Sequence, residues 1–286
     1  MTNNLKAYIS NFTNKPITNF SSISGGDIST AYRIETSNNS YFLKVNRNPD
    51  ALKMFLLEAN GLQLIAKTNT IQTPKVIACD IFEDVAFLLL EFIESKPPSN
   101  RDFENLGHQL ADLHKYTSDN FGLDEDNFIG RLSQSNSQHK SWIDFYTFER
   151  LLPQLELAEQ KQLLSDKECP TKQHIKTQLQ PFFEGTRPSL LHGDLWSGNF
   201  LVSKDGTPYL IDPAVYYGHY EVDIAMSKLF GGFGNSFYKV YHSHFHTDAY
   251  TEDRITLYQL YYLLVHLNMF GSSYYNSVSA ILKRYF

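Results

Sequence analysis

Three polar side chains in the C-terminal half of the chain have the types and spacing of a phosphoryl-transfer site. Asp194 is followed five residues later by Asn199, and a second acid, Asp212, ends an apolar run. Transfer of a phosphoryl group to a hydroxyl needs a carboxylate beside the acceptor oxygen and oxygen ligands for magnesium. We therefore assign Asp194 as the base, and Asn199 and Asp212 as magnesium ligands. The alternative is an ordinary Gly- and Asp-rich surface loop, but the spacing of all three groups favours the chemical interpretation.

The residues around this motif resemble a known family of kinases. The run 191–199 reads LHGDLWSGN, and the run 212–218 reads DPAVYYG. Both are similar to the fructosamine kinase (ketosamine-3-kinase) family, a branch of the protein-kinase-like phosphotransferases close to the aminoglycoside kinases. The likeness extends from Gly25-Gly26 to the run HLNMFG at 266–271, so it covers nearly the whole chain.

The resemblance implies a donor, an acceptor and a metal. ATP would donate the phosphoryl group with the help of Mg²⁺. The acceptor would be the C3 hydroxyl of a ketosamine of the fructosamine or ribulosamine type, either a small molecule or a protein-linked group, and phosphorylation would trigger deglycation. Trp196, which lies beside the proposed base, would form a flat wall for the open-chain sugar or its amine substituent.

Paired glycines near the N-terminus are the expected phosphate-binding loop. Gly25 and Gly26 stand between two β-favouring runs, which is typical of a hairpin. Glycines let backbone N–H groups approach a phosphate closely. Gly-Gly alone would suit a plain hairpin turn equally well, and it is the similarity to the family's G-G-x-I loop that implies the phosphate contact.

A lysine and a glutamate in the next two elements are the expected phosphate-orienting ion pair. Lys44 is the one charged residue of an apolar strand over 41–45, and Glu58 borders the apolar stripe of a helix over 52–66. A carboxylate at that border needs a partner, and Lys44 is the natural one. Taken separately, Lys44 and Glu58 could each be a solvated surface charge. Lys44 could also be a charged residue that keeps an edge strand from pairing with another chain. In this order they match the kinase pair that orients the α- and β-phosphates.

The N-terminal part predicts a nucleotide-binding lobe that ends at a Pro-containing connector. Strands are expected at 74–78 and 85–90, and the second is apolar throughout, as a strand buried on both faces would be. The chain then enters the connector at 91–94, where we place the lobe boundary. The resemblance implies that Glu91 and Ile93 present main-chain groups to the adenine ring.

Residues 95–286 predict a larger, mainly helical lobe that carries catalysis and acceptor binding. Apolar residues recur there at helical spacing, in stretches around 103–113, 142–157, 170–183 and 251–286. Residues 1–94 contribute a small antiparallel sheet with one main helix, so the expected fold is α+β, bilobal and protein-kinase-like. In related phosphotransferases an Asp at the position of Asp223 braces the catalytic loop.

Composition and charge limit the possible partners. The 286 residues include 31 acidic and 25 basic side chains, a formal net charge of −6. No broad basic surface therefore favours nucleic acid or an anionic membrane. No apolar run approaches the ~20 residues that span a bilayer, and the first residues show no signal peptide. The two cysteines match no metal or redox spacing. We expect a cytoplasmic protein that is a monomer by default.

Three alternating histidines are a weaker metal candidate. On a strand, His242, His244 and His246 would share one face, as zinc ligands do. No fourth ligand stands at a suitable spacing, so we favour a loop between helices without a metal.

Two other functions remain open. An aminoglycoside- or choline-type kinase would use the same chemistry but would need an acid-rich cleft for its cationic acceptor, and Trp196 with the run 212–218 favours a ketosamine. A nucleotide-binding pseudokinase would usually lack the lysine, the base or a metal ligand, and all of these residue types are present here.

Overall fold

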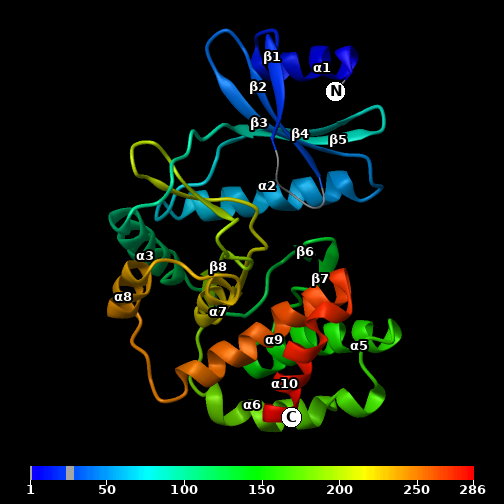
Figure 1. The fold of residues 1–286 in the computed structure, drawn as a ribbon, viewed down its shortest axis with the longest axis vertical. Helices are drawn as coiled ribbons and strands as arrows, with labels where there is room; N and C mark the ends of the chain where they lie inside the picture. The colour runs from blue at the N-terminus through cyan, green and yellow to red at the C-terminus, as the bar shows by residue number, and fades with distance from the viewer. Residues whose placement is uncertain (1, 24–28) are drawn as a thin grey trace. The chain divides into compact units, whose positions relative to one another are not determined.

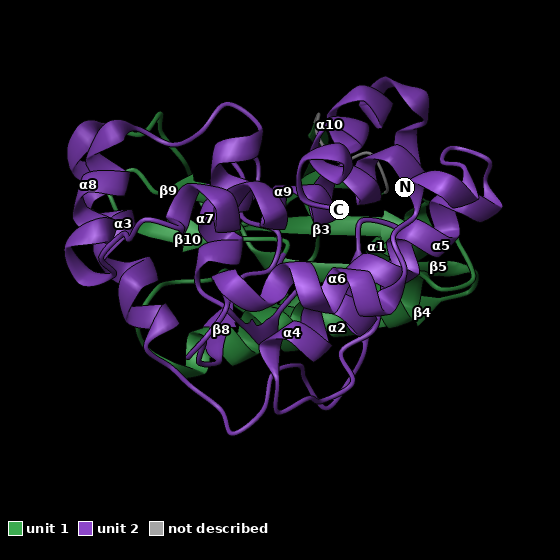
Figure 2. Cartoon of the chain, turned by 90° about the horizontal axis from the view of Figure 1, so that it is seen from below, with its two compact units in different colours: residues 1–98, 201–212 green, residues 99–200, 213–286 purple. Residues whose placement is uncertain are grey.

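The chain consists of two compact units, each with its own core (Figures 1 and 2). A computed structural model describes residues 2–23 and 29–286. Unit 1 comprises residues 1–98 and 201–212, and unit 2 comprises residues 99–200 and 213–286.

This division differs from the expected one in two respects. The sequence predicts a single boundary after residue 94, whereas the first unit continues to Pro98 and regains residues 201–212 later in the chain. The first difference has a local cause, because Ser99 and Asp102 form a capping box that starts the first helix of unit 2.

Unit 1 is built on a five-stranded antiparallel sheet with the order β1-β2-β3-β5-β4 (Figure 1). Its strands are β1 (Asn19–Ile23), β2 (Thr30–Glu35), β3 (Ser40–Asn46), β4 (Val76–Phe82) and β5 (Val85–Glu91). The first six residues of β5 are buried, as its apolar sequence predicts. The small antiparallel sheet of the expected α+β fold is thus confirmed.

One helix covers each face of this sheet. Helix α1 (Asn3–Thr13) packs on the face that carries Phe87, and helix α2 (Ala51–Lys67) packs on the face that carries Leu88. Successive strand residues point to opposite faces, which explains the alternation. Lys44 lies directly opposite Leu88 in the β3–β5 ladder. Its side chain therefore belongs to the α2 face.

A second, smaller sheet explains why residues 201–212 belong to unit 1. The short strands β9 (Phe200–Val202) and β10 (Pro208–Leu210) form a hairpin. The residue after β9, Ser203, pairs with Ser95 in the connector. A tertiary contact of this kind leaves no signal in the apolar spacing of either segment.

Unit 2 is mainly helical, as the sequence predicts. Its α-helices are α3 (Asn100–His114), α4 (Trp142–Phe145), α5 (Leu152–Gln160), α6 (Lys172–Leu179), α7 (Glu221–Leu229), α8 (Asn235–His244), α9 (Thr251–Phe270) and α10 (Tyr275–Tyr285). Two short antiparallel ladders pair β6 (Asn127–Ile129) with β7 (Leu132–Gln134), and β8 (Ser189–Leu191) with β11 (Tyr216–Gly218). Short 3₁₀ segments span Asp166–Glu168, Gln180–Phe182 and Ser272–Tyr274. Within residues 2–23 and 29–286, no helix is both long and apolar enough to cross a lipid bilayer.

The helix expected over 142–157 contains a π-helical stretch. Residues Tyr146–Leu151 are π-helical and join α4 to α5 without a break in the chain's helical course. π-Helical turns are rare and often occur at functional sites. Apolar spacing does not distinguish them from α-helix.

The histidine tract does not form a strand. His242 and His244 lie in the last turn of α8, where residues two apart do not share a face. Instead, Nε2 of His244 lies 2.8 Å from Nδ1 of His108 on α3. No group of three or more His, Cys, Asp or Glu side chains is arranged to hold a metal ion in the part of the chain that the structure describes.

Candidate active site

In unit 1, Lys44 lies between two carboxylates. Its Nζ is 2.8 Å from Oε1 of Glu58 and 2.5 Å from Oδ1 of Asp212. Strand β3 presents the lysine, α2 presents the glutamate, and the chain after β10 presents Asp212. The expected pair of Lys44 and Glu58 is therefore formed, and Asp212 shares the same ammonium group.

Each of these three charges shifts the protonation of its neighbours. The side chains of Lys44 and Glu58 are only 12% and 15% exposed. Burial lowers the pKa of Lys44, but the carboxylates of Asp212 and Glu58 outweigh burial and hold this pKa above its ordinary value. Burial raises the pKa of Glu58 to about 7 against the influence of Lys44, and the negative charge of Asp212 acts in the same direction as burial. Lys44 is thus a firmly protonated cation at neutral pH.

Asp212 has an uncommon backbone conformation. Its φ of 54° lies in the left-handed region, which residues other than Gly seldom occupy, although Asp does so more often than most. Such conformations concentrate at functional sites. The side chain is 43% exposed, so its carboxylate contacts Lys44 while remaining accessible from solvent.

In unit 2, the proposed base is held by the proposed metal ligand. The side-chain nitrogen of Asn199 donates to the main-chain oxygen of Asp194 at 2.8 Å and to its Oδ2 at 3.1 Å. These bonds orient the carboxylate and also fix the amide of Asn199. Its side-chain oxygen has no hydrogen-bond partner among the described residues.

Asp223 braces the backbone that leads to the base. Its carboxylate accepts hydrogen bonds from the N–H groups of His192 (2.8 Å) and Gly193 (2.9 Å). A third contact joins its Oδ2 to Nε2 of His114 at 3.0 Å, and Nδ1 of that ring lies 2.6 Å from the hydroxyl of Tyr241. All of this network is buried, so each bond is made in a low-dielectric environment.

Gly193 fits where a larger residue would not. Its φ is +84°, and a Cβ there would lie 2.1 Å from the main-chain oxygen of Ala214. The same peptide is held from the other side, because the hydroxyl of Tyr262 donates to the carbonyl of Gly193 at 2.7 Å. His192 completes the turn, since its Nδ1 accepts from the N–H of Asp194 at 3.2 Å.

Trp196 is exposed and stands two positions after Asp194 in the same loop. Its side chain is 37% exposed although it is large and apolar. The indole ring covers Gly198 so closely that a Cβ on that residue would lie 2.4 Å from the ring. The glycine therefore allows the indole to lie flat over the loop.

The connector and the glycine pair complete the set of predicted residues. Glu91 ends β5, and its N–H donates to the carbonyl of Lys75 at 2.9 Å. The main-chain groups of Ile93 make no hydrogen bond within the part of unit 1 that is described. Gly25 and Gly26 lie outside the described residues.

The donor set of these two clusters fits Mg²⁺ and ATP. Magnesium prefers oxygen ligands, and the amide oxygen of Asn199 and the carboxylate of Asp212 are of that type. Lys44 supplies a fixed positive charge for phosphate oxygens. The structure groups Lys44, Glu58 and Asp212 in unit 1, and it groups Asp194 with Asn199 in unit 2.

Several residues that support the base have no motif of their own. His114, Tyr241 and Tyr262 come from three different helices and reach the loop only through the tertiary fold. Tyr241 and Tyr262 are also fully buried and belong to the core. A tyrosine at a core position is a weak signal, because a buried hydroxyl needs a partner.

Comparisons with known proteins show the family of the chain. The sequence profile described as "Fructosamine kinase" matches residues 1–286. A "Probable ketoamine kinase" of Lactiplantibacillus plantarum is 40% identical over 265 residues, which cover 92% of each chain. A chloroplastic protein-ribulosamine 3-kinase of Arabidopsis thaliana is 40% identical over 275 residues, covering 94% of this chain and 83% of the relative.

A solved structure of a related protein has the same fold as this chain. The crystal structure of a "Putative fructosamine-3-kinase" from Haemophilus somnus has a TM-score of 0.88 and 27% sequence identity, and the match covers 99% of this chain and 96% of that one. The bilobal α+β kinase fold is therefore confirmed. The chain belongs to the fructosamine kinase family and is an ATP-dependent phosphotransferase that acts on a hydroxyl group.

Proposed function

We propose that this protein phosphorylates the C3 hydroxyl of ketosamines of the fructosamine or ribulosamine type and so triggers deglycation. The observation that carries the proposal is the loop in which Asn199 holds Asp194 and in which Trp196, two positions after Asp194, is exposed. That loop offers a proton acceptor and a flat apolar surface together. The names of the relatives support a ketoamine as the acceptor.

On this proposal, unit 1 holds the nucleotide. Lys44, oriented by Glu58, binds non-bridging oxygens of the phosphates, and the main chain at Glu91 and Ile93 receives the adenine edge. The peptide groups of Ile93, which make no hydrogen bond to any described residue, suit this role. Gly25 and Gly26, which lie outside the described residues, are the proposed phosphate-binding glycines.

Asn199 and Asp212 are the proposed magnesium ligands. Mg²⁺, when bound, supplies positive charge that neutralises the phosphate oxygens and orients them. The amide of Asn199 is already fixed by Asp194, and the carboxylate of Asp212 is already fixed by Lys44. Both oxygen donors are therefore positioned by the protein itself.

Asp194 accepts the proton of the acceptor hydroxyl. The C3 oxygen then forms a bond to the γ-phosphorus, the bond from that phosphorus to the β–γ bridging oxygen breaks, and ADP leaves. The transition state of such transfers is loose, so orientation and charge stabilisation matter more than the basicity of the carboxylate. The bracing of the base by Asp223, through Gly193, serves orientation.

The product of this reaction should break down without further help from the enzyme. A C3-phosphorylated ketoamine can lose a proton from C1 and form an enol between C1 and C2. That enol expels the phosphate from C3, and water hydrolyses the remaining imine. The products are the free amine, inorganic phosphate and a deoxy-dicarbonyl sugar, so no C–N bond is broken in the active site.

Phosphorus NMR tests the proposal. The enzyme is incubated with ATP, magnesium and fructosyl-lysine or ribulosyl-lysine, then removed, and the phosphorylated product is followed over time. Slow release of inorganic phosphate with matching recovery of lysine is expected. A stable phosphomonoester would point to a terminal hydroxyl and to an aminoglycoside- or choline-type kinase. No acceptor-dependent ADP would point to a pseudokinase.

We also propose that the enzyme works in the cytoplasm. Ketoamines form there on proteins and small amines, and ATP is available. Both cysteines, Cys79 and Cys169, are free thiols, which suits a reducing compartment.

A further inference from the structure

Arg150 is a buried cation without a carboxylate partner. It lies in the π-helical stretch of unit 2, its side chain is fully buried, and it takes part in none of the ion pairs found among the described residues. An ionised group removed from water is costly unless its charge is compensated. Such a residue therefore needs an explanation other than stability.

The guanidinium is held by neutral oxygens instead. Its Nη1 donates to the carbonyls of Ser135 (2.5 Å) and Glu149 (2.8 Å), and its Nη2 donates to Oδ1 of Asn136 at 2.7 Å. Asn136 is itself fixed, because its N–H donates to a carboxylate oxygen of Asp126 at 2.7 Å. These three hydrogen bonds fix the position of the guanidinium.

The guanidinium also packs on aromatic rings, of which Tyr216 and Phe145 are nearer than Tyr261, at 5.7 Å. Its central carbon lies 4.0 Å from the centre of the Tyr216 ring and 4.6 Å from that of Phe145. These cation–π contacts fix the plane of Tyr216. The hydroxyl of Tyr216 is buried and makes no hydrogen bond of ordinary geometry among the described residues, so packing against Arg150 and Phe145 contributes to holding this ring.

Tyr216 in turn packs against the residue that precedes the base. A Cβ built on Gly193 would lie 3.4 Å from Cε1 of Tyr216, and one built on Gly218 would lie 2.7 Å from Cε2. The ring therefore fills the space between these two glycines. Movement of the ring would shift Gly193, and Asp194 would move with it.

We propose that Arg150 is a positioning residue for Asp194, which acts by stacking on Tyr216 and so fixing the backbone at Gly193. This inference rests on the proposed role of Asp194 as the base. Asp223 and Tyr262 hold the polar groups of Gly193. Arg150 adds support behind the same residue through the ring of Tyr216, on which it packs.

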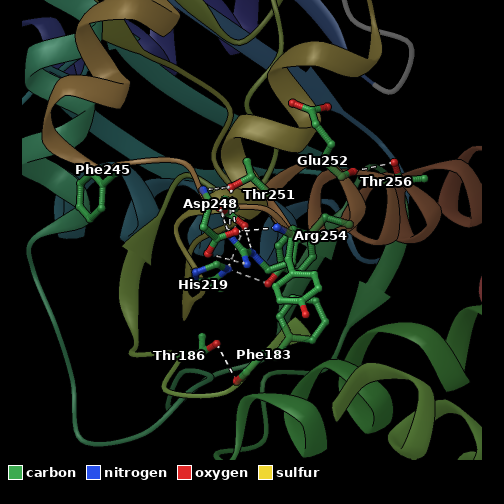
Figure 3. Close-up of polar contacts among 12 residues, drawn as sticks. Phe183, Thr186, His219, Phe245, Asp248, Thr251, Glu252, Arg254 and Thr256 are labelled. Atoms are coloured by element: carbon green, nitrogen blue, oxygen red, sulfur yellow. Dashed lines mark hydrogen bonds and ion pairs between the residues drawn. The ribbon is translucent and has the colours of Figure 1, made fainter. Parts of the chain in front are cut away.

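A second buried arginine in unit 2 provides the contrast and the control. Figure 3 shows Arg254 turned toward Asp248 and Thr251, and these contacts are 3.1 Å long. It also binds both carboxylate oxygens of Glu221, at 2.5 Å and 2.7 Å. The paired carboxylates compensate its charge, so its burial is explained by structure alone.

The test compares steady-state kinetics of Arg150→Met, Arg150→Lys and the control Arg254→Lys. The active fraction of each protein is counted by calorimetric titration with ATP, and thermal unfolding is recorded. Methionine keeps much of the volume, whereas lysine keeps the charge but loses the plane that stacks. We expect both Arg150 variants to lower kcat per active molecule by about 10- to 100-fold, with the KM for ATP changed less than about two-fold. Arg254→Lys should lower the unfolding temperature and leave kcat per active molecule unchanged.

A double variant tests the route through the ring. If Arg150 acts through Tyr216, then Arg150→Met combined with Tyr216→Leu should lose no more kcat than the worse single variant. Additive losses, or an Arg150→Met enzyme with normal kcat per active molecule, would overturn the inference. Asp194→Asn is measured in parallel. If that variant keeps its turnover, the base assignment fails together with this inference, whereas loss at Asp194 with normal kcat at Arg150 removes this inference alone.

Discussion

Lys44 and Asp212 are 168 positions apart in the sequence, yet their charged atoms lie 2.5 Å apart within one compact unit. The contact exists because residues 201–212 return to unit 1 and because Asp212 adopts a left-handed φ of 54°. Glu58 holds the same ammonium group from α2. The lysine is therefore oriented by the protein itself, and less conformational entropy is lost when it binds a phosphate.

Replacing Asp212 by Ala tests this arrangement. The change removes a proposed magnesium ligand and one of the two carboxylates on Lys44. Loss of a residue that only supports a metal ligand costs about 10- to 100-fold, so loss of the ligand itself should lower kcat/KM for ATP by about 100-fold or more. Magnesium titrations of initial rates are the measurement. Asp205→Ala is the control, because Asp205 lies in the exposed turn between β9 and β10, shortly before Asp212 in the chain. Unchanged magnesium dependence in Asp212→Ala would place the metal elsewhere.

Replacing Asp194 by Asn tests the base. The amide keeps the size of the side chain and can still contact Asn199, but it cannot accept a proton from the acceptor hydroxyl. We expect kcat to fall by about two to four orders of magnitude, the usual effect of losing a general base. ATP affinity, measured by calorimetry, should be nearly unchanged because Lys44 and Asp212 are intact. Asp112→Asn on the exposed part of α3 should behave as the wild type. Near-normal turnover of Asp194→Asn would rule out its role as base.

The parts of the site that the sequence predicts are those with short-range signals. Asp194 and Asn199 stand in one loop, so their spacing alone indicates a contact, and the structure gives it at 3.1 Å. Lys44 and Glu58 lie in consecutive elements whose apolar periodicity shows which face each occupies. The fold class follows from the same periodicity together with the family resemblance.

The parts that the sequence does not predict depend on contacts between distant segments. Apolar spacing cannot show that residues 201–212 rejoin the first unit, because the bridge of Ser95 with Ser203 is a backbone contact. The π-helical turn around Arg150 has the same apolar pattern as an α-helix. His114 reaches Asp223 from a helix more than 100 positions earlier, and no local motif marks it.

The raised pKa of Glu58 predicts a specific pH dependence of stability. The pKa of about 7 in the folded protein lies above the ordinary value of 4.5. The folded state therefore holds a proton that the unfolded chain releases, and the contribution of Glu58 to stability is fully present below pH 4.5 and is lost as the pH rises through about 7. Glu58→Gln cannot titrate, so we expect the difference in unfolding free energy between the two proteins to shift in favour of the variant across this window.

Urea unfolding at several pH values between about 5 and 8 measures that difference. His219 acts with the opposite sign, because burial lowers its pKa to about 3 and the unfolded chain takes up a proton as the pH falls below 6.5. This contribution is the same in both proteins and cancels in the comparison. Glu83→Gln, in the exposed turn between β4 and β5, is the matched control. A pH-independent difference between the wild type and Glu58→Gln would contradict the raised pKa.

Gly198→Ala separates acceptor binding from nucleotide binding. The backbone of Gly198 does not have a positive φ, so alanine is tolerated there by the backbone itself. Its Cβ would, however, lie 2.4 Å from the ring of Trp196, and the indole must tilt or swing away. If this ring is the wall for the sugar, the KM for the ketoamine should rise by about ten-fold or more, equivalent to ~1.4 kcal/mol of lost binding. Because the side chains of Lys44, Asn199 and Asp212 are unchanged, the KM for ATP should stay within about two-fold. Ser197→Ala, which removes a hydroxyl from the neighbouring exposed position, controls for changes in the loop itself.

Initial rates with ribulosyl-lysine and fructosyl-lysine at saturating ATP give the KM values for the two acceptors. If Gly198→Ala and Trp196→Ala both keep the wild-type KM for each acceptor, Trp196 does not form the sugar-binding wall.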